Sequence, residues 1–308
     1  MSARPIVIGS RGSDLALFQA RYIQSRLTEL GVDKVEIKVI ATSGDRIDDL
    51  SFDKMEGKGF FTKELEEALL ARQIDLAVHS LKDLMTTQPR GLKLGAIGYR
   101  ADRREMLLIR REAANGRGLL PVRPGGKIGT SSARRACQIA CLNPELKIDS
   151  LRGNVPTRIR KLREGQYDAI LIAAAGVTRL ELDVSDLEVV LLEPEVFLPA
   201  PAQGILGMQI RDDDSDTEEV VSGLDDPRAR TEAALERGLL ARFDAGCSLP
   251  LGVYSEVQGD RLRLRAVLGV AQDSRWIGLC KADAQGTSVN STIDHIYDKL
   301  TRGVPHCA

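Results

Sequence analysis

Short apolar segments alternate with helical segments along most of the chain, and this alternation constrains the fold more than any other feature. Residues 5–9 and 35–42 are short and apolar, as strands are, and between them apolar side chains recur at intervals of three and four from residue 14 to residue 30. Strands that alternate with helices in this way are typical of parallel pairing. The pattern predicts an α/β fold with mostly parallel sheets.

The alternation starts again after residue 100, which predicts a second lobe of the same kind. Residues 100–104 cross into it, and residues 205–211 form a strand that returns to the first lobe. From about residue 225 the pattern changes to one long helix, three alternating strands and a last helix, which is typical of an α+β domain. The predicted domains are 1–100 with 200–221, 101–199 and 222–308.

The segment Ile74–Leu84 combines a strand with polar residues that can carry chemistry. Residues 75–78 are apolar enough for a short buried strand, and four polar side chains follow: His79, Ser80, Lys82 and Asp83. Ligands of open α/β sheets bind outside the carboxyl ends of the strands, so an acid and a base at this position suggest a site. A surface pair that caps the strand fits the segment equally well. For His79 we expect a hydrogen-bonded structural role rather than that of a general base.

Arginines occur where helices disfavour them. Segments 10–13, 129–132 and 151–154 each join a strand to a helix, and all three carry arginines in the junction or in the first helical turn. A cation there opposes the helix dipole at a cost of about 0.3–1 kcal/mol, whereas an anion is stabilised by the free backbone N–H groups. These arginines are Arg11, Arg134, Arg135, Arg152 and Arg158. They predict a bound anion, and side chains that point into solvent are the alternative.

The charge distribution supports an anionic ligand. The whole chain has a net charge of −1, but residues 100–180 contain 17 Lys and Arg against 7 Asp and Glu. No phosphate loop or dinucleotide fingerprint follows a strand, and arginine forks bind carboxylates as well as phosphates. A ligand with several carboxylates fits best. The low aromatic content of 4% and the small net charge disfavour a nucleic-acid-binding protein, whereas a non-catalytic anion-binding protein stays open.

The cysteines indicate a cytoplasmic protein with free thiols. There are five, an odd number, and the first strand begins at Pro5, so we expect no export signal; the longest apolar run, 169–177, is too short for a membrane span. For Cys137 and Cys141, four residues apart on a helix, we expect core packing rather than metal binding, because no nearby His or Cys completes a ligand set. Cys247 lies in a loop of small residues, where a thiol is reachable.

Together these motifs resemble the porphobilinogen deaminase (hydroxymethylbilane synthase) family. The matching segments are RGSDLA (11–16), GKGFF (57–61), VHSLKD (78–83), GTSSARR (129–135), SLRGNV (150–155) and GCSLPLG (246–252). The resemblance implies two lobes built like those of periplasmic binding proteins and a third domain. It implies condensation of four porphobilinogen molecules head to tail into hydroxymethylbilane, with release of ammonia. It also implies a dipyrromethane cofactor joined to Cys247 by a thioether, in a cytoplasmic monomer whose partner is the small-molecule substrate.

The resemblance also assigns roles to single residues. Asp83 is the expected catalytic carboxylate, with Lys82 beside it. The residues expected to hold the cofactor are Ser13, Lys82, Asp83, Thr130, Ser131, Ser132, Arg134, Arg135 and Arg152, and those expected to hold the substrate are Arg11, Arg152, Arg158 and Arg179. Lys54 and Lys58 belong to an expected lid, and no metal is expected. The chain has Met85, Ala202, Gln209 and Ala245 where the family commonly has Pro, Gly, Glu and Gly.

Overall fold

The computed structural model describes residues 5–42, 62–244, 249–273 and 275–302. The chain divides into two compact units, one made of Met1–Ala101 with Ala202–Ala233 and the other of Asp102–Pro201 with Ala234–Ala308. Each unit contains a five-stranded sheet, and the second also contains a three-stranded antiparallel sheet. The predicted α/β class with a smaller α+β part is confirmed. The three-domain division at the predicted boundaries stays a prediction.

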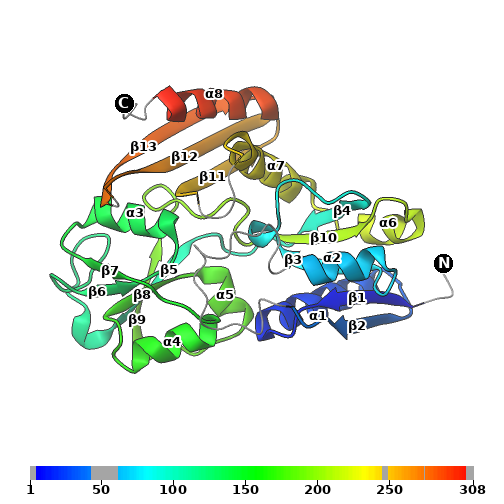
Figure 1. Cartoon of the computed structure of the whole chain (residues 1–308), viewed down its shortest axis with the longest axis horizontal. Helices are drawn as coiled ribbons and strands as arrows, with labels where there is room; N and C mark the ends of the chain where they lie inside the picture. The colour runs from blue at the N-terminus through cyan, green and yellow to red at the C-terminus, as the bar shows by residue number, and fades with distance from the viewer. Residues whose placement is uncertain (1–4, 43–61, 245–248, 274, 303–308) are drawn as a thin grey trace. The chain divides into compact units, whose positions relative to one another are not determined.

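The sheet of the first unit has the strand order β2-β1-β3-β10-β4. β1 pairs parallel with β2 and β3, whereas β10 pairs antiparallel with β3 and β4. In Figure 1, β10 is the yellow-green strand among blue and cyan ones, which confirms the predicted return of residues 205–211 to the first lobe. The elements are β1 (Ile6–Ser10), α1 (Asp14–Glu29), β2 (Val35–Val39), α2 (Lys63–Leu70), β3 (Leu76–Ser80), a 3₁₀ turn (Leu81–Asp83), β4 (Leu92–Gly98), β10 (Leu206–Arg211) and α6 (Ser215–Ser222).

The five-stranded sheet of the second unit has the order β7-β6-β8-β5-β9. β6 pairs parallel with β7 and β8, whereas β5 pairs antiparallel with β8 and β9. The elements are β5 (Glu105–Arg110), a 3₁₀ turn (Arg111–Ala113), β6 (Lys127–Gly129), α3 (Ala133–Leu142), β7 (Lys147–Asp149), α4 (Val155–Arg163), β8 (Ala169–Ala173), α5 (Ala174–Arg179) and β9 (Leu187–Leu192).

Both five-stranded sheets are mixed, but four of the five strands in each run in the same direction, so the expectation of mostly parallel sheets is confirmed with one exception per sheet. In each sheet one inner strand, β10 or β5, runs against both of its neighbours. A helix between two strands is what favours parallel pairing. Residues 99–104, which lead into β5, and residues 193–205, which lead into β10, contain no helix. The alternation in the sequence therefore predicts the direction of the other strands but not of these two.

Side-chain caps fix where the helices at the three arginine-bearing junctions begin. Ser13 caps α1, Ser132 caps α3 and Asn154 caps α4. Each side chain accepts a hydrogen bond from the backbone N–H three residues later, over 2.9–3.4 Å. Such a cap satisfies a backbone donor that the helix itself cannot pair. The predicted site segments at these junctions therefore lie at true helix N-termini.

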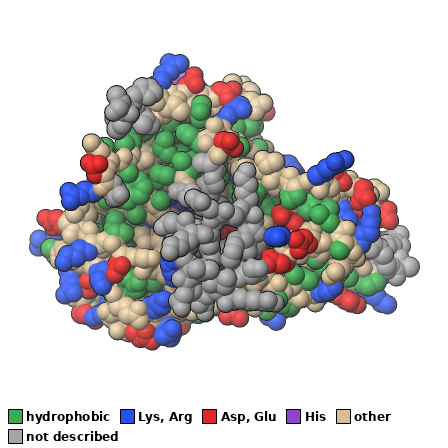
Figure 2. Space-filling view, viewed as in Figure 1, with side chains coloured by type: hydrophobic (Ala, Val, Ile, Leu, Met, Phe, Trp, Pro, Cys, Tyr) green, Lys and Arg blue, Asp and Glu red, His purple; other side chains and the backbone are tan. Residues whose placement is uncertain are grey.

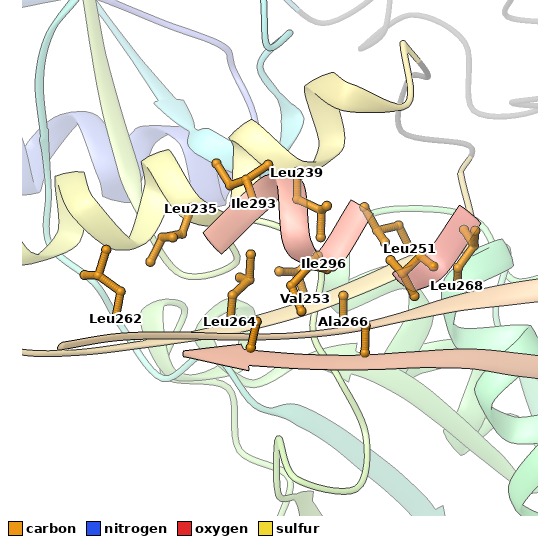
Figure 3. Packing of buried hydrophobic residues seen from close by; sticks show 13 residues of the cluster. Leu235, Leu239, Leu251, Val253, Leu262, Leu264, Ala266, Leu268, Ile293 and Ile296 are labelled. Carbon is orange, nitrogen blue, oxygen red and sulfur yellow. The ribbon is translucent and has the colours of Figure 1, made fainter. Parts of the chain in front are cut away.

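The C-terminal part of the second unit has its own core. Its elements are the part of α7 (Pro227–Arg242) that follows Ala233, β11 (Leu251–Gln258), β12 (Arg261–Gln272), β13 (Arg275–Gly286) and α8 (Val289–Arg302). Figure 3 shows Leu235 and Leu239 of α7 and Ile293 and Ile296 of α8 packed over apolar side chains of the sheet. All four are 3% exposed or less, so one face of the sheet is closed by these helices.

Hydrophobic side chains also gather over this sheet on the face of the molecule seen in Figure 2. Ile277 of β13 is 54% exposed and Val196 is 38% exposed. A cavity of about 400 Å³ lies between α3, residues 195–198 and strands β12 and β13, and none of its lining residues is a predicted site residue. No helix in the described part of the chain is both long and apolar enough to cross a membrane.

Candidate functional site

The turn after β3 presents Asp83 on a rigid base. The backbone forms one turn of 3₁₀ helix over Leu81–Asp83. Leu81 is fully buried and Leu84 is 2% exposed, so apolar side chains anchor the turn on both sides of Lys82 and Asp83. The Asp83 side chain is exposed, and Lys82 is half-buried with its Nζ 3.4 Å from Gln203 Oε1. The predicted pair thus lies at the carboxyl end of an inner strand, with its acid accessible.

His79 lies inside β3, so the strand extends two residues beyond its predicted end at Val78. β10 covers this end of the strand, because His79 lies opposite Gly207 in the ladder. The imidazole is 6% exposed, and its Nε2 is 3.1 Å from Gln209 Oε1. Burial, with a smaller contribution from the positive charge of Arg11, lowers the pKa of His79 to about 4. A neutral, buried, hydrogen-bonded imidazole supports the structural role that the sequence suggests.

Arg11 and Ser13 lie at the junction of β1 and α1, in the same unit as Asp83. Both are half-buried, and Ser13 caps the helix. The positive charge of Arg11 acts on His79 of β3, where it contributes to the lowered pKa of the imidazole. A second link joins the two strand ends, because Gln19 Nε2 of α1 donates to Ser80 Oγ over 2.8 Å. Four predicted site residues of the first unit therefore follow the ends of two neighbouring strands: Arg11 and Ser13 follow β1, and Lys82 and Asp83 follow β3.

The hydroxyl groups before α3 form hydrogen bonds within segment 129–132 and to the backbone of segment 150–154. Thr130 is 4% exposed, and its Oγ1 accepts from Ser132 N over 3.2 Å. Ser131 is exposed, but its Oγ donates to Leu151 O over 2.8 Å and accepts from Leu151 N over 3.1 Å. These bonds hold segments 129–132 and 150–154 side by side, which brings the Ser131 and Arg152 regions together.

Arg134 and Arg135 already bind an anion inside the protein, Glu105, which is not among the predicted site residues. Glu105, the first residue of β5, is fully buried. Its Oε1 accepts from Arg134 Nη2 over 2.7 Å, and its Oε2 accepts from Arg135 Nε and Nη2 over 3.0 and 2.7 Å. Both arginines are 6% exposed. The cations at the start of α3 are thus balanced in part by Glu105, and their contact with a ligand stays a prediction.

The remaining predicted arginines differ in burial. Arg152 and Arg158 are half-buried, and Arg158 Nε donates to Gly153 O over 2.7 Å, which fixes the loop before α4. Arg179, at the end of α5, is 5% exposed. Arg152 and Arg158 therefore keep surface that a ligand can reach, whereas the Arg179 side chain is almost wholly inside the protein.

Three predicted functional residues, Lys54, Lys58 and Cys247, lie outside the described residues, so their lid and cofactor roles stay predictions. Of the helical cysteine pair, Cys137 is fully buried, as expected, and burial raises the pKa of its thiol to about 12. Cys141 is exposed, contrary to expectation, because the last turn of α3 borders the open cavity. Within the described residues, no three His, Cys, Asp or Glu side chains are grouped to hold a metal ion.

Two family models match the chain. The model for the dipyromethane cofactor binding domain of porphobilinogen deaminase matches residues 6–219, and the model for the C-terminal domain of porphobilinogen deaminase matches residues 230–286. Together they cover most of both described units and include the residues of the cysteine loop.

Relatives match over most of their length. The porphobilinogen deaminase of Roseiflexus sp. (strain RS-1) is 44% identical, over 88% of each chain. That of Syntrophobacter fumaroxidans is 42% identical over 87% of this chain and 85% of its own. That of Maridesulfovibrio salexigens is 39% identical over 96% of this chain and 99% of its own. Among solved structures, a Salmonella typhimurium periplasmic binding protein with high arginine specificity aligns with 75% of this chain and 97% of its own, at 11% identity and a TM-score of 0.41.

The motifs, the two family models and the near full-length relatives agree. The chain therefore belongs to the porphobilinogen deaminase family, and its activity is that of hydroxymethylbilane synthase in tetrapyrrole biosynthesis, with a dipyrromethane cofactor.

Proposed function

We propose that Asp83 is the catalytic carboxylate, with Lys82 beside it. The observation that carries this proposal is the position of Asp83: exposed, yet on a single turn held by the buried Leu81 and Leu84 at the end of an inner strand. A carboxylate held this firmly does not have to reorganise when charge develops next to it, which is the condition for strong electrostatic stabilisation.

The reaction gives this carboxylate two tasks. In each cycle the bond from the aminomethyl carbon of porphobilinogen to nitrogen breaks, and ammonia leaves with the electron pair. The positive charge that remains is shared with the pyrrole nitrogen, until a new carbon–carbon bond to the next pyrrole forms and that pyrrole carbon loses its proton. Asp83 holds the ammonium group before it leaves and then stabilises the pyrrole N–H that carries the charge. Lys82, held by Gln203, is suited to bind a carboxylate next to the reacting ring.

The donor groups of the second unit fit a cofactor with acetate and propionate side chains. Backbone N–H groups at two capped helix N-termini, the Thr130, Ser131 and Ser132 hydroxyls, and the guanidinium groups of Arg134, Arg135 and Arg152 are all donors to carboxylates. We assign these residues, with Ser13, Lys82 and Asp83, to the dipyrromethane, and Arg11, Arg152, Arg158 and Arg179 to the incoming substrate. The bound dipyrromethane, attached to Cys247 as a thioether, supplies the pyrrole carbon to which the first substrate unit is joined. The arginines orient the reacting rings and hold them in place.

We also propose that the protein works as a cytoplasmic monomer without nucleic-acid or membrane partners. Its net charge of −1 and aromatic content of 4% support the absence of polyanion partners, and its odd number of cysteines supports a reducing compartment. Sedimentation of the purified protein tests the monomer directly.

The intact mass of the purified protein tests the cofactor attachment. We expect wild type to exceed the mass of its sequence by one dipyrromethane, and Cys247→Ser to have the bare mass. Cys280→Ser is the control, since Cys280 is a described, half-buried cysteine outside the motifs, and it should keep the adduct. A wild-type protein with the bare mass, or an adduct that survives in Cys247→Ser, would contradict the assignment.

A further inference from the structure

Glu105 of the second unit contacts two arginines through its carboxylate. It is fully buried at the start of β5, between the neighbouring strands β8 and β9. Each of its oxygens binds a different guanidinium group: Oε1 binds Arg134 over 2.7 Å, and Oε2 binds Arg135 over 2.7 Å. One carboxylate thus joins two consecutive arginines of α3.

Backbone carbonyls fix the other ends of the same two guanidinium groups. Arg134 Nη1 donates to Leu198 O over 2.9 Å, and Arg135 Nη1 donates to Leu171 O over 3.0 Å. Gln138, one turn further along α3, also donates to Leu198 O and accepts from Leu198 N. Each guanidinium is therefore held at two places, and its plane has little freedom to turn. A planar guanidinium held in this way keeps one orientation, which is a requirement for geometrically specific binding of a carboxylate.

The charge of this cluster is unbalanced. Two guanidinium groups and one carboxylate leave one positive charge, and both arginines are 6% exposed. Burial lowers the pKa of Arg134, as expected where water is excluded, and the charge of Glu105 opposes that effect. Without Glu105, two like charges would be buried next to each other, which is far less favourable than a compensated pair. With Glu105 present, the cluster keeps a net charge of +1, which one carboxylate of a ligand would neutralise.

We propose that Glu105 is a positioning residue for Arg134 and Arg135: it holds both guanidinium groups in one arrangement and reduces their joint charge to that of a single carboxylate partner. This inference rests on the proposed role of the two arginines in holding the cofactor. It adds a residue that does not touch the ligand. It also explains why two arginines tolerate the unfavourable start of α3.

The test compares wild type, Glu105→Gln, Glu105→Asp and the control Glu236→Gln. Glu105→Gln keeps the shape and removes the charge, and Glu105→Asp keeps the charge but is too short to reach both arginines. Glu236 is also fully buried in the second unit, binds Ser255 Oγ over 2.7 Å and lies 3.7 Å from Arg103, so Glu236→Gln is a matched loss of a buried charge away from α3. For each protein the thermal midpoint, the fraction of chains with the adduct by intact mass, and kcat and KM per loaded chain are measured well below the lowest midpoint.

We expect Glu105→Gln to lower the loaded fraction, or to raise KM per loaded chain, by about 10- to 100-fold, the range for losing a charge-assisted contact. Glu105→Asp should be intermediate, and Glu236→Gln should lose stability but load and bind as wild type does. Wild-type loading and KM in Glu105→Gln, or an equal loss of loading in Glu236→Gln, would overturn the inference.

If Glu105→Gln does not fold, Glu105→Asp decides: a raised KM at near-wild-type stability supports the inference, and a wild-type KM contradicts it. A wild type without the adduct overturns the proposed function itself, and this inference with it.

Discussion

His79 and Gln209 form a buried pair in which the imidazole Nε2 lies 3.1 Å from the amide oxygen. The Gln209 Nε2 group donates in turn to Gln88 Oε1 over 2.9 Å and to Glu66 Oε1 over 3.3 Å. Because the amide oxygen faces His79, Nε2 of the imidazole is the donor of the pair. Gln209 of β10 thus links β3, the strand that leads to Asp83, to the side chains of Gln88 and Glu66.

Stability should fall as His79 is forced to take up a proton. Its pKa is lowered from 6.5 to about 4 by burial. Between these two values the unfolded chain binds a proton at this residue and the folded protein does not. The free energy of unfolding is therefore highest above pH 6.5 and decreases as the pH falls to about 4. The loss is on the order of 3 kcal/mol. Urea unfolding from pH 7 to pH 4 should show a steeper decline for wild type than for His79→Gln, and equal slopes would contradict this.

Gln209→Glu is the matched change on the other side of the pair. It places a negative charge beside His79, which favours the protonated imidazole and should raise the pKa of His79 well above 4. The new carboxylate also loses both N–H bonds and faces Glu66, so the variant should be less stable at pH 7. The chain has three histidines, which makes the NMR titration of His79 readily assignable. An unchanged His79 pKa would show that the pair is not formed in solution.

Replacing Ala202 by the glycine that is usual in the family should make the protein more stable. Its φ is +60°, in the left-handed region that glycine adopts freely, and the side chain is fully buried. Ala202→Gly should therefore stabilise the protein by up to about 1 kcal/mol. Gly204→Ala is the opposite control: φ there is +88°, and the added Cβ would meet Ala101 O at 2.7 Å. Denaturant midpoints should move in opposite directions, and a less stable Ala202→Gly would disprove the strain.

The arginine set should divide into residues that affect folding and residues that affect binding. Arg134→Leu removes one partner of a buried carboxylate, so it should reduce both stability and cofactor loading. Arg152 is half-buried, so Arg152→Leu should leave stability nearly at the wild-type level. It should weaken binding of the cofactor or of the early chain by about 1.5–3 kcal/mol of binding free energy, which lowers loading or early elongation. Arg179→Leu should reduce stability but affect loading least, since the side chain is 5% exposed. Normal loading and activity in both Arg134→Leu and Arg152→Leu would contradict the anion-binding role.

The sequence predicts much of this fold because local signals suffice for most elements. Caps such as Ser132 and Asn154 mark helix starts. The alternation predicts the three strands of the C-terminal sheet near residues 252–258, 261–271 and 274–284, and each strand ends within two residues of these bounds. Direction in a sheet is not a local property, and so the antiparallel β5 and β10 escape prediction. The end of β3 is misjudged for a related reason: a polar residue resembles the end of a strand until a neighbouring strand is known to bury it.

Site residues are predictable when their chemistry is unusual for their position, and they are missed when it is ordinary. Arginines at helix starts are unusual, and they drew attention to Arg134 and Arg135. An acidic residue before an apolar strand is ordinary, and it resembles a solvent-exposed end. Glu105 lies 29 residues before Arg134 in the chain, and only the packing of α3 beside the sheet brings the two together. An acidic residue at the start of an apolar strand within a basic segment is the one signal that points to Glu105.

Asp83 is the centre of the functional account. Asp83→Asn keeps the shape of the side chain and removes its charge, so the loss should fall on kcat rather than on substrate binding. Asp83→Glu keeps the charge but moves it by one methylene group, and it should retain a small residual rate. Neither change should affect folding, because the side chain is exposed.

The most direct measurement is single-turnover release of ammonia from porphobilinogen by wild type, Asp83→Asn and Asp83→Glu, each purified with the cofactor attached as verified by intact mass. We expect release to be nearly abolished in Asp83→Asn and slow but detectable in Asp83→Glu, with substrate binding close to that of wild type in both. Release by loaded Asp83→Asn at the wild-type rate would remove Asp83 from the mechanism and leave Lys82 as the residue to test next.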